Sequence, residues 1–127
     1  MDTTDPFLAR FEDGEIGPGA FDHKAHVRAA YEMLCRYEFI DACARYASTI
    51  RGMAERAGAF DKYNTTITLA FMSLIAERIV ETNASNWEAF IQTNPDLLTS
   101  NVLSSWYSQD RLQSPLARKQ FVLPDKV

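Results

Sequence analysis

KYNTTITLAFMSLIAERIVE, residues 62–81, is the stretch that decides the fold. At the helical step of about 100° per residue, its apolar side chains fall on almost every side of the cylinder, which is typical of a helix that other elements cover. The stretch therefore predicts a helix over about 62–81 at the centre of an all-α domain. Around this central apolar helix we expect a compact bundle of about six or seven helices.

Two amphipathic helices are predicted before the central stretch. Asp22 is a suitable N-cap for a helix at 22–36 whose body begins at His23. Residues 39–57 repeat apolar side chains at steps of three and four, and Gly58 is a natural stop for that helix. A shorter helix begins at Asp5 and Pro6, because proline is favoured at the first helical position.

The last third of the chain predicts only short helices. Ser85 and Glu88 have the spacing of a capping box, and Pro95 ends the short helix that they open. After residue 96 the apolar residues form broken helical pieces, the last of which Pro115 opens. No run of useful length alternates apolar and polar residues as a strand would.

Composition narrows the class of protein. The 127 residues are 46% hydrophobic and 24% charged, as in a globular protein, and the length suits a single all-α domain, 1–127. The net charge of -4, with the basic residues dispersed, argues against a nucleic-acid partner. The acidic N-terminal stretch has no secretion signal, and no segment approaches the about 20 apolar residues of a membrane span. We therefore expect a cytoplasmic protein with no membrane partner.

The two cysteines, Cys35 and Cys43, fall within predicted helices and lack the spacing of a redox or metal motif. We expect both to be buried free thiols, which favours a reducing compartment. A disulfide between them is the alternative.

The two histidines, His23 and His26, share one face of the predicted helix at 22–36. The same face carries Val27 and Leu34, so both rings are expected to point inward. In one interpretation, backbone carbonyls or hydroxyls satisfy the rings, which then fix how the helices pack. In the other, the rings belong to a site, because histidine titrates near neutral pH and acts as a general acid or base.

Metal binding is the less supported form of such a site. The H-x-x-H pattern supplies two ligands, whereas a stable zinc or iron site usually needs a third protein ligand. The acidic candidates Asp22, Asp61 and Glu77 lie at no recognised spacing from the histidines. The sequence therefore predicts neither a metal nor a cofactor.

A polar stripe of Thr66, Ser73 and Glu77 spans about 40° of the predicted central helix. Its simpler interpretation is the one edge of the helix that faces solvent. The alternative places this stripe, or the turn at residues 63–65, opposite the histidines across a small pocket. Hydroxyl and amide groups would then orient a small polar molecule.

Three runs of sequence form a pattern: FDHKAHVRAAY at 21–31, DKYNTTIT at 61–68, and WYS followed by LQSPLARKQFVLPD within 106–125. Together they resemble a family of small bacterial helical proteins of unknown function. The family pattern is F-x-H-x-x-H-[VL]-R, Y-H-x-T-[IL]-T and S-P-x-A-R-x-x-F-V-x-P-D. The resemblance implies motif positions for His23, His26, Tyr63, Thr66 and Thr68. Asn64 stands where the family has a histidine, and an amide is a poor transition-metal ligand.

The leading functional hypothesis is a small-molecule binding or catalytic pocket between the helices at 22–36 and 62–81. In this pocket His23 and His26 are hydrogen-bonding or acid–base groups, and the ligand is oriented by Tyr63, Asn64 and Thr66.

The alternative hypothesis is a noncatalytic interaction module or an oligomerising regulatory protein. It would dock a partner, or a second copy in a homo-oligomer, through an exposed aromatic tail around Trp106, Tyr107 and Phe121.

Overall fold

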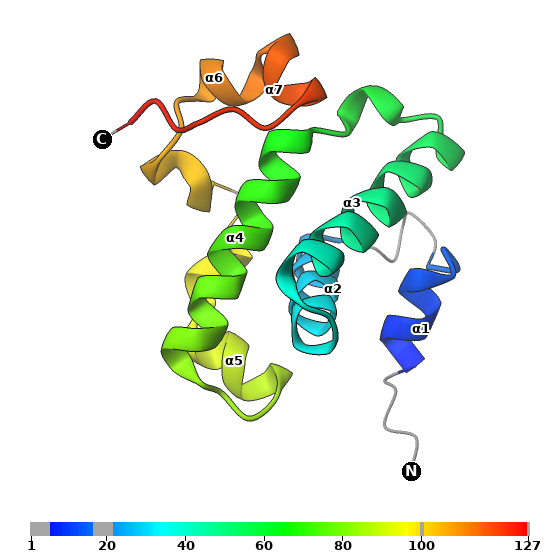
Figure 1. Ribbon diagram of the computed structural model, residues 1–127, viewed down its shortest axis with the longest axis vertical. Coiled ribbons are helices and arrows are strands. Elements are labelled where there is room, and N and C mark those ends of the chain that lie inside the picture. The colour runs from blue at the N-terminus through cyan, green and yellow to red at the C-terminus, as the bar shows by residue number, and fades with distance from the viewer. Residues whose placement is uncertain (1–5, 17–21, 100, 127) are drawn as a thin grey trace.

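The computed structural model describes residues 6–16, 22–99 and 101–126, and it contains helices and no strand within these ranges. The predicted all-α class is therefore confirmed (Figure 1). The helices are α1 (Pro6–Glu12), α2 (His23–Arg36), α3 (Phe39–Arg56), η1 (Phe60–Lys62), α4 (Thr65–Thr82), α5 (Trp87–Thr93), η2 (Pro95–Leu98), η3 (Val102–Ser105), α6 (Gln109–Gln113) and α7 (Pro115–Lys119), where η marks a 3-10 helix.

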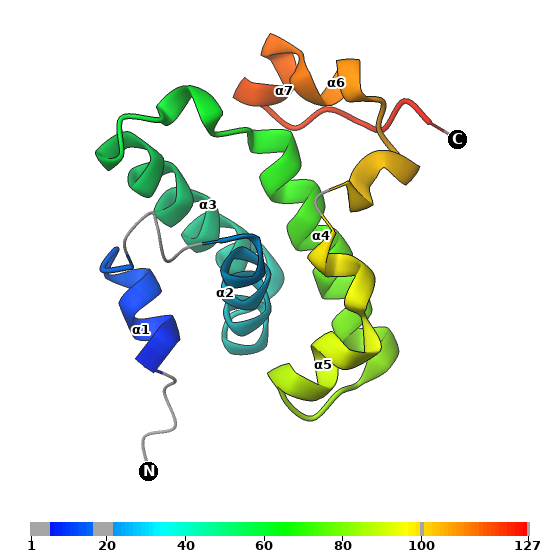
Figure 2. The ribbon, with the colours of Figure 1, turned by 180° about the vertical axis from the view of Figure 1, so that it is seen from behind.

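α4 is the central helix. It lies between α2 and α3 on one side and the C-terminal helices on the other (Figures 1 and 2), and it packs against α2, α3, α5, α7 and η3. Met72 and Ile75 on this helix are fully buried. α4 begins at Thr65, three residues later than predicted. The reason is that η1 occupies residues 60–62, and the side chain of Asn64 then caps α4 by accepting from the Ile67 amide at 2.9 Å.

The ends of α2 and α3 agree with the predictions. α2 begins at His23, where the Asp22 side chain accepts from the Ala25 amide at 3.0 Å. α3 ends at Arg56, and Gly58 adopts the left-handed conformation with φ 68° that suits glycine. Residues 1–5, including the predicted cap Asp5, lie outside the described residues.

α5 begins differently from the prediction. Its cap is Asn86, whose side chain accepts from the Ala89 amide at 2.8 Å, so the predicted capping box of Ser85 and Glu88 is wrong. Asparagine and serine are comparable N-cap residues, so the pattern alone did not separate Asn86 from Ser85 one position earlier.

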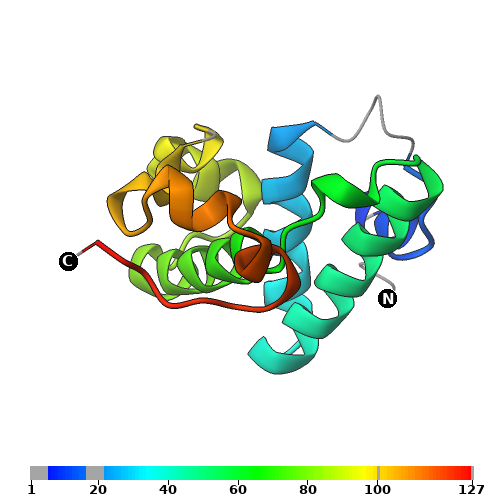
Figure 3. The same cartoon turned by 90° about the horizontal axis from the view of Figure 1, so that it is seen from above.

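The tail that follows α7, residues 120–126, runs in extended form across the start of α4 (Figure 3). Tyr107 donates its hydroxyl proton to the Val122 carbonyl at 2.8 Å and is only 3% exposed. The expectation that Tyr107 belongs to an exposed aromatic surface is therefore wrong, because the tail covers it. Trp106 and Phe121 are 40% and 42% exposed.

Both described cysteines are free thiols, with Cys35 exposed and Cys43 half-buried. The prediction that both are buried is wrong for Cys35 and is met only in part by Cys43. Cys35 lies seven residues after Arg28, on the polar face of α2. In the described part of the chain no helix is both long and apolar enough to cross a membrane.

Candidate functional site

A pocket of about 570 Å³ lies between the first turns of α2 and α4 and the segment that contains η3 and the start of α6. This volume is within the usual range for pockets that hold small molecules. Four of the five predicted site residues line it: His23, His26, Tyr63 and Asn64. The turn before α4 and the two histidines therefore line the same pocket.

His23 is the first residue of α2, and its ring is fixed by two neighbours. Its Nε2 lies 3.0 Å from the carbonyl oxygen of Leu97 in η2. Because a carbonyl can only accept, Nε2 carries the proton, and Nδ1 is the acceptor nitrogen of the neutral ring. The ring also meets Phe71 of α4 edge to face, with centroids 5.6 Å apart and planes at 87°. His23 thus joins α2 to both α4 and η2.

His26 is anchored through the other ring nitrogen. Its Nδ1 lies 3.0 Å from the carbonyl oxygen of Asp22, so Nδ1 carries the proton and Nε2 is the acceptor of the neutral ring. Burial lowers the pKa of His26 below its ordinary value of 6.5, and the neighbouring His23 adds to this effect. The backbone bond to Asp22 and the charge of its carboxylate oppose it. His26 is therefore held mainly neutral at pH 7.

Asn64 builds the wall of the pocket. Besides capping α4, it donates from Nδ2 to the carbonyl of Leu112 at 2.7 Å and is 7% exposed. The hydroxyl of Thr68, another lining residue, donates to the Asn64 carbonyl at 2.7 Å. The side-chain oxygen and nitrogen of Asn64 thus both form hydrogen bonds with backbone atoms of the protein, and they tie α4 to α6.

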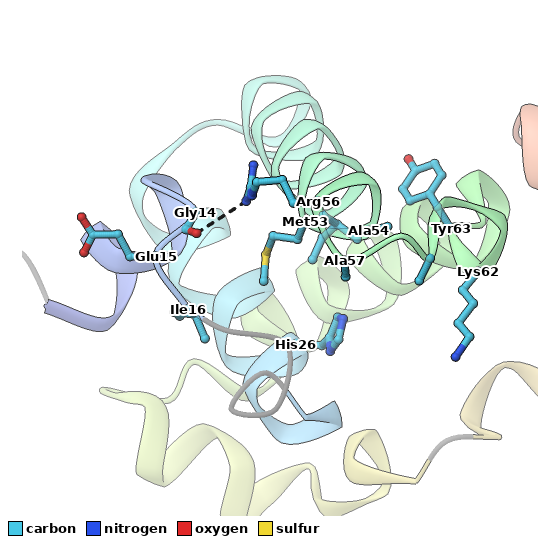
Figure 4. A pocket seen from close by; sticks show the side chains of 12 residues that line it. Gly14, Glu15, Ile16, His26, Met53, Ala54, Arg56, Ala57, Lys62 and Tyr63 are labelled. Atoms are coloured by element: carbon cyan, nitrogen blue, oxygen red, sulfur yellow. Dashed lines mark hydrogen bonds between the residues drawn. The ribbon is translucent and has the colours of Figure 1, made fainter.

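A second pocket, of about 360 Å³, adjoins the first and is drawn in Figure 4. The two pockets share the lining residues His26, Ile50, Lys62 and Tyr63. The second pocket continues along apolar side chains of α3 such as Met53. His26 and Tyr63 therefore stand where two cavities meet.

Thr66, the fifth predicted site residue, lies outside both pockets. It is fully buried, and its hydroxyl donates to the Gln120 carbonyl at 2.7 Å and accepts from the Val122 amide at 3.1 Å. Its partner is the tail and not a ligand. Ser73 and Glu77, which share its stripe, are exposed, so their simpler interpretation as a solvent-facing edge is confirmed.

Several lining residues were not anticipated from the sequence. Lys62 lies on η1, Asn101 and Ser104 lie on or beside η3, and Gln109 begins α6. These short elements have no helical periodicity from which a facing direction could be inferred. Lys62 was the one with a usable signal, because it directly precedes the predicted Tyr63 turn.

The described residues contain no group of three His, Cys, Asp or Glu side chains that could hold a metal ion. The described lining of the larger pocket offers imidazoles, hydroxyls, amides and an ammonium, and His23 uses Nε2 on a backbone carbonyl. This arrangement suits hydrogen bonding and proton transfer with an organic ligand.

Comparisons with known proteins give no relative. No family model matches the chain, and neither a curated protein nor a solved structure shows significant similarity to it. The resemblance to a bacterial family of unknown function therefore stays a prediction.

Proposed function

We propose that the protein binds a small molecule in the pocket between α2 and α4, with His23 and His26 as hydrogen-bonding or acid–base groups. One observation carries the proposal. Both rings line the same pocket, and each is anchored to a backbone carbonyl through a different nitrogen. An anchored ring keeps one tautomer and one orientation, as binding or general-base catalysis requires.

The two histidines differ in the role that we assign to them. Because burial lowers the pKa of His26, its ring is mainly neutral at pH 7, which is the form that acts as a general base. His23, held by Leu97 and Phe71, orients the ligand. Rigid placement of such groups is what makes a pocket selective.

The ligand-orienting set of the proposal differs from the original prediction in one member. Tyr63 stays, because it lines the pocket, and Asn64 stays as the residue that shapes the wall. Thr68 replaces Thr66, because Thr68 lines the pocket and its hydroxyl oxygen can still accept after donating its proton to the Asn64 carbonyl.

The test is a screen of small polar molecules against the 15N-labelled protein, followed by backbone amide shifts. We expect bound molecules to shift residues 64–68 and 101–112, and the combined change His23→Ala and His26→Ala to abolish binding while helix content by circular dichroism is retained. Lys24→Ala, at an exposed site between the two histidines, is the matched control and retains binding. Unchanged binding by the double variant would contradict the proposal.

A second candidate is a surface for a partner protein or a second copy. It is favoured by exposed apolar residues near the C-terminal end, with Trp106 40%, Phe121 42% and Leu123 69% exposed. Light scattering should then detect assembly that depends on concentration and that Trp106→Ala weakens. A strict monomer at high concentration would contradict self-association.

We also propose a cytoplasmic location. The two free thiols suit a reducing compartment, which supports this location. The net charge of -4 with dispersed basic residues does not favour a nucleic-acid partner there. Fractionation of cells that produce the protein tests this directly.

A further inference from the structure

The pocket between α2 and α4 differs in charge from the chain as a whole. The chain carries a net charge of -4, yet the described residues that line this pocket include no aspartate and no glutamate. They include Lys62 and two imidazoles. Within the described chain the ammonium of Lys62 has no carboxylate at ion-pair distance. The one fixed charge of this lining is therefore positive and unneutralised.

The backbone around the pocket also contributes a positive electrostatic potential. His23 and His26 lie within the first four residues of α2, and Ile67 and Thr68 lie within the first four residues of α4. Helix N-termini carry partial positive charge, and neither helix has an acidic residue in its first turn. Asp22 caps α2 and offsets that end, but it is exposed and outside the lining, whereas α4 is capped by a neutral amide.

The rest of the pocket divides into donors and apolar surface. Asn101, Ser104 and Gln109 line it with amide and hydroxyl donors. Ile67, Phe71 and Leu103 line it with apolar side chains. Lys62 and His26 line both pockets, and in Figure 4 the Lys62 side chain is extended. A ligand in this pocket meets one ammonium, several neutral donors and an apolar surface.

We propose that the pocket binds a small organic anion, a carboxylate carried on a compact apolar body, with Lys62 as the residue that recognises the charge. The inference rests on the proposed function and adds the chemical class of the ligand. An ammonium beside a carboxylate forms a charge-assisted hydrogen bond, about twice as strong as a neutral one. Among the described residues that line this pocket, a cationic ligand would meet no compensating carboxylate and would lose hydration without replacement.

Three probes of similar size separate charge from shape: phenylacetate, phenylacetamide and phenethylamine. Each is titrated into the full-length 15N-labelled protein at pH 7.5, and shifts are followed at residues 64–68 and at the imidazole nitrogens. We expect phenylacetate to bind about tenfold more tightly than phenylacetamide, as the stronger charge-assisted bond implies. Phenethylamine should bind most weakly.

The variants assign the preference to Lys62, which is exposed on η1 and can be changed without loss of packing. Lys62→Gln should reduce the preference for phenylacetate over phenylacetamide to within about threefold and leave the affinity for phenylacetamide unchanged. Lys62→Arg should retain the preference. Lys24→Gln removes an exposed positive charge on α2 outside the lining and is the control.

The outcomes distinguish this inference from the proposed function. If phenylacetamide or phenethylamine shifts the same residues at equal or lower concentration than phenylacetate, the anion class is wrong and the pocket itself stands. A full preference that survives in Lys62→Gln would overturn the role of Lys62. If none of the three probes shifts the pocket residues at millimolar concentration, the inferred ligand class is overturned, whereas the proposed function is decided by the wider screen of small polar molecules.

Discussion

The Nε2 of His23 lies 3.0 Å from the carbonyl oxygen of Leu97, a residue 74 positions away in sequence. This hydrogen bond joins the first residue of α2 to η2. The same short helix is tied to α4 by Asp96, whose two carboxylate oxygens accept from Arg78 at 2.9 Å and 2.7 Å. The ion pair therefore helps to fix the carbonyl that holds the His23 ring.

We predict that Asp96→Asn disturbs His23 at a distance. Because Asp96 is about half exposed, the lost ion pair should cost about 1 kcal/mol or less in the free energy of unfolding. The His23 ring resonances should nevertheless shift. Asp41→Asn breaks the exposed pair with Arg45 at 3.1 Å on α3 and serves as the control, with a similar small cost and no shift at His23. An unperturbed His23 spectrum in Asp96→Asn would contradict the link.

His26 makes stability depend on pH. Burial lowers its pKa below 6.5 in the folded state, so below pH 6.5 the unfolded chain binds more protons at this site than the folded chain does. Its contribution to the free energy of unfolding is therefore undiminished above pH 6.5 and falls as pH drops through the lowered pKa. Nearby charges that modulate this pKa are Asp22, which opposes the shift, and His23, which adds to it.

The measurement compares urea unfolding of the native chain and of His26→Gln at pH 7.5 and 5.5. The native chain should lose more stability between these values than the variant does, since glutamine does not titrate. A proton titration of the His26 ring by NMR provides the second readout. A folded pKa above 6.5 would refute the prediction.

The substitution Asn64→Asp should destabilise the folded protein. The oxygen that caps α4 is kept in Asn64→Asp, but the donor to the Leu112 carbonyl is lost and a carboxylate faces that oxygen at a position that is 7% exposed. We expect a loss of about 1 to 3 kcal/mol in the free energy of unfolding, measured by urea denaturation. Asn86→Asp is the matched control, because Asn86 is an exposed cap and aspartate caps as well as asparagine there. Equal effects of the two changes would argue against the bond to Leu112.

Thr66→Val should loosen the tail. The change removes a buried hydroxyl and leaves the Gln120 carbonyl and the Val122 amide without that partner, at a cost of about 1 to 3 kcal/mol. Amide exchange of residues 120–126 should accelerate. Thr93→Val removes an exposed hydroxyl that bonds only within its own helix, and it should change stability by less than about 0.5 kcal/mol. Unaltered exchange in the tail would show that Thr66 does not hold it.

Much of the helical framework follows from local sequence. Asp22 and Gly58 mark helix boundaries through their own side-chain and backbone chemistry, and the apolar circumference of residues 62–81 requires a central position. The boundary at Thr65 was missed because helical periodicity extends through η1 without indicating that Asn64 turns inward as a cap. Local pattern predicts that a helix exists better than it predicts its first residue.

The candidate site was only partly predictable, for a different reason. His23, His26 and Tyr63 could be found because their side chains are chemically distinctive, but Leu97 serves through its carbonyl, which every residue type possesses. Thr66 was assigned to the pocket because the position of a residue on a helix does not reveal which neighbour covers that face. Here the neighbour is an extended tail, which has no helical period.

The opposite anchoring of the two histidines is the central claim, and a long-range proton–nitrogen spectrum of the imidazole rings at pH 8 tests it most directly. The account predicts His23 with its proton on Nε2 and His26 with its proton on Nδ1, because each of these nitrogens donates to a backbone carbonyl. His26 protonated on Nε2, or rapid averaging of the two tautomers in either ring, would contradict it.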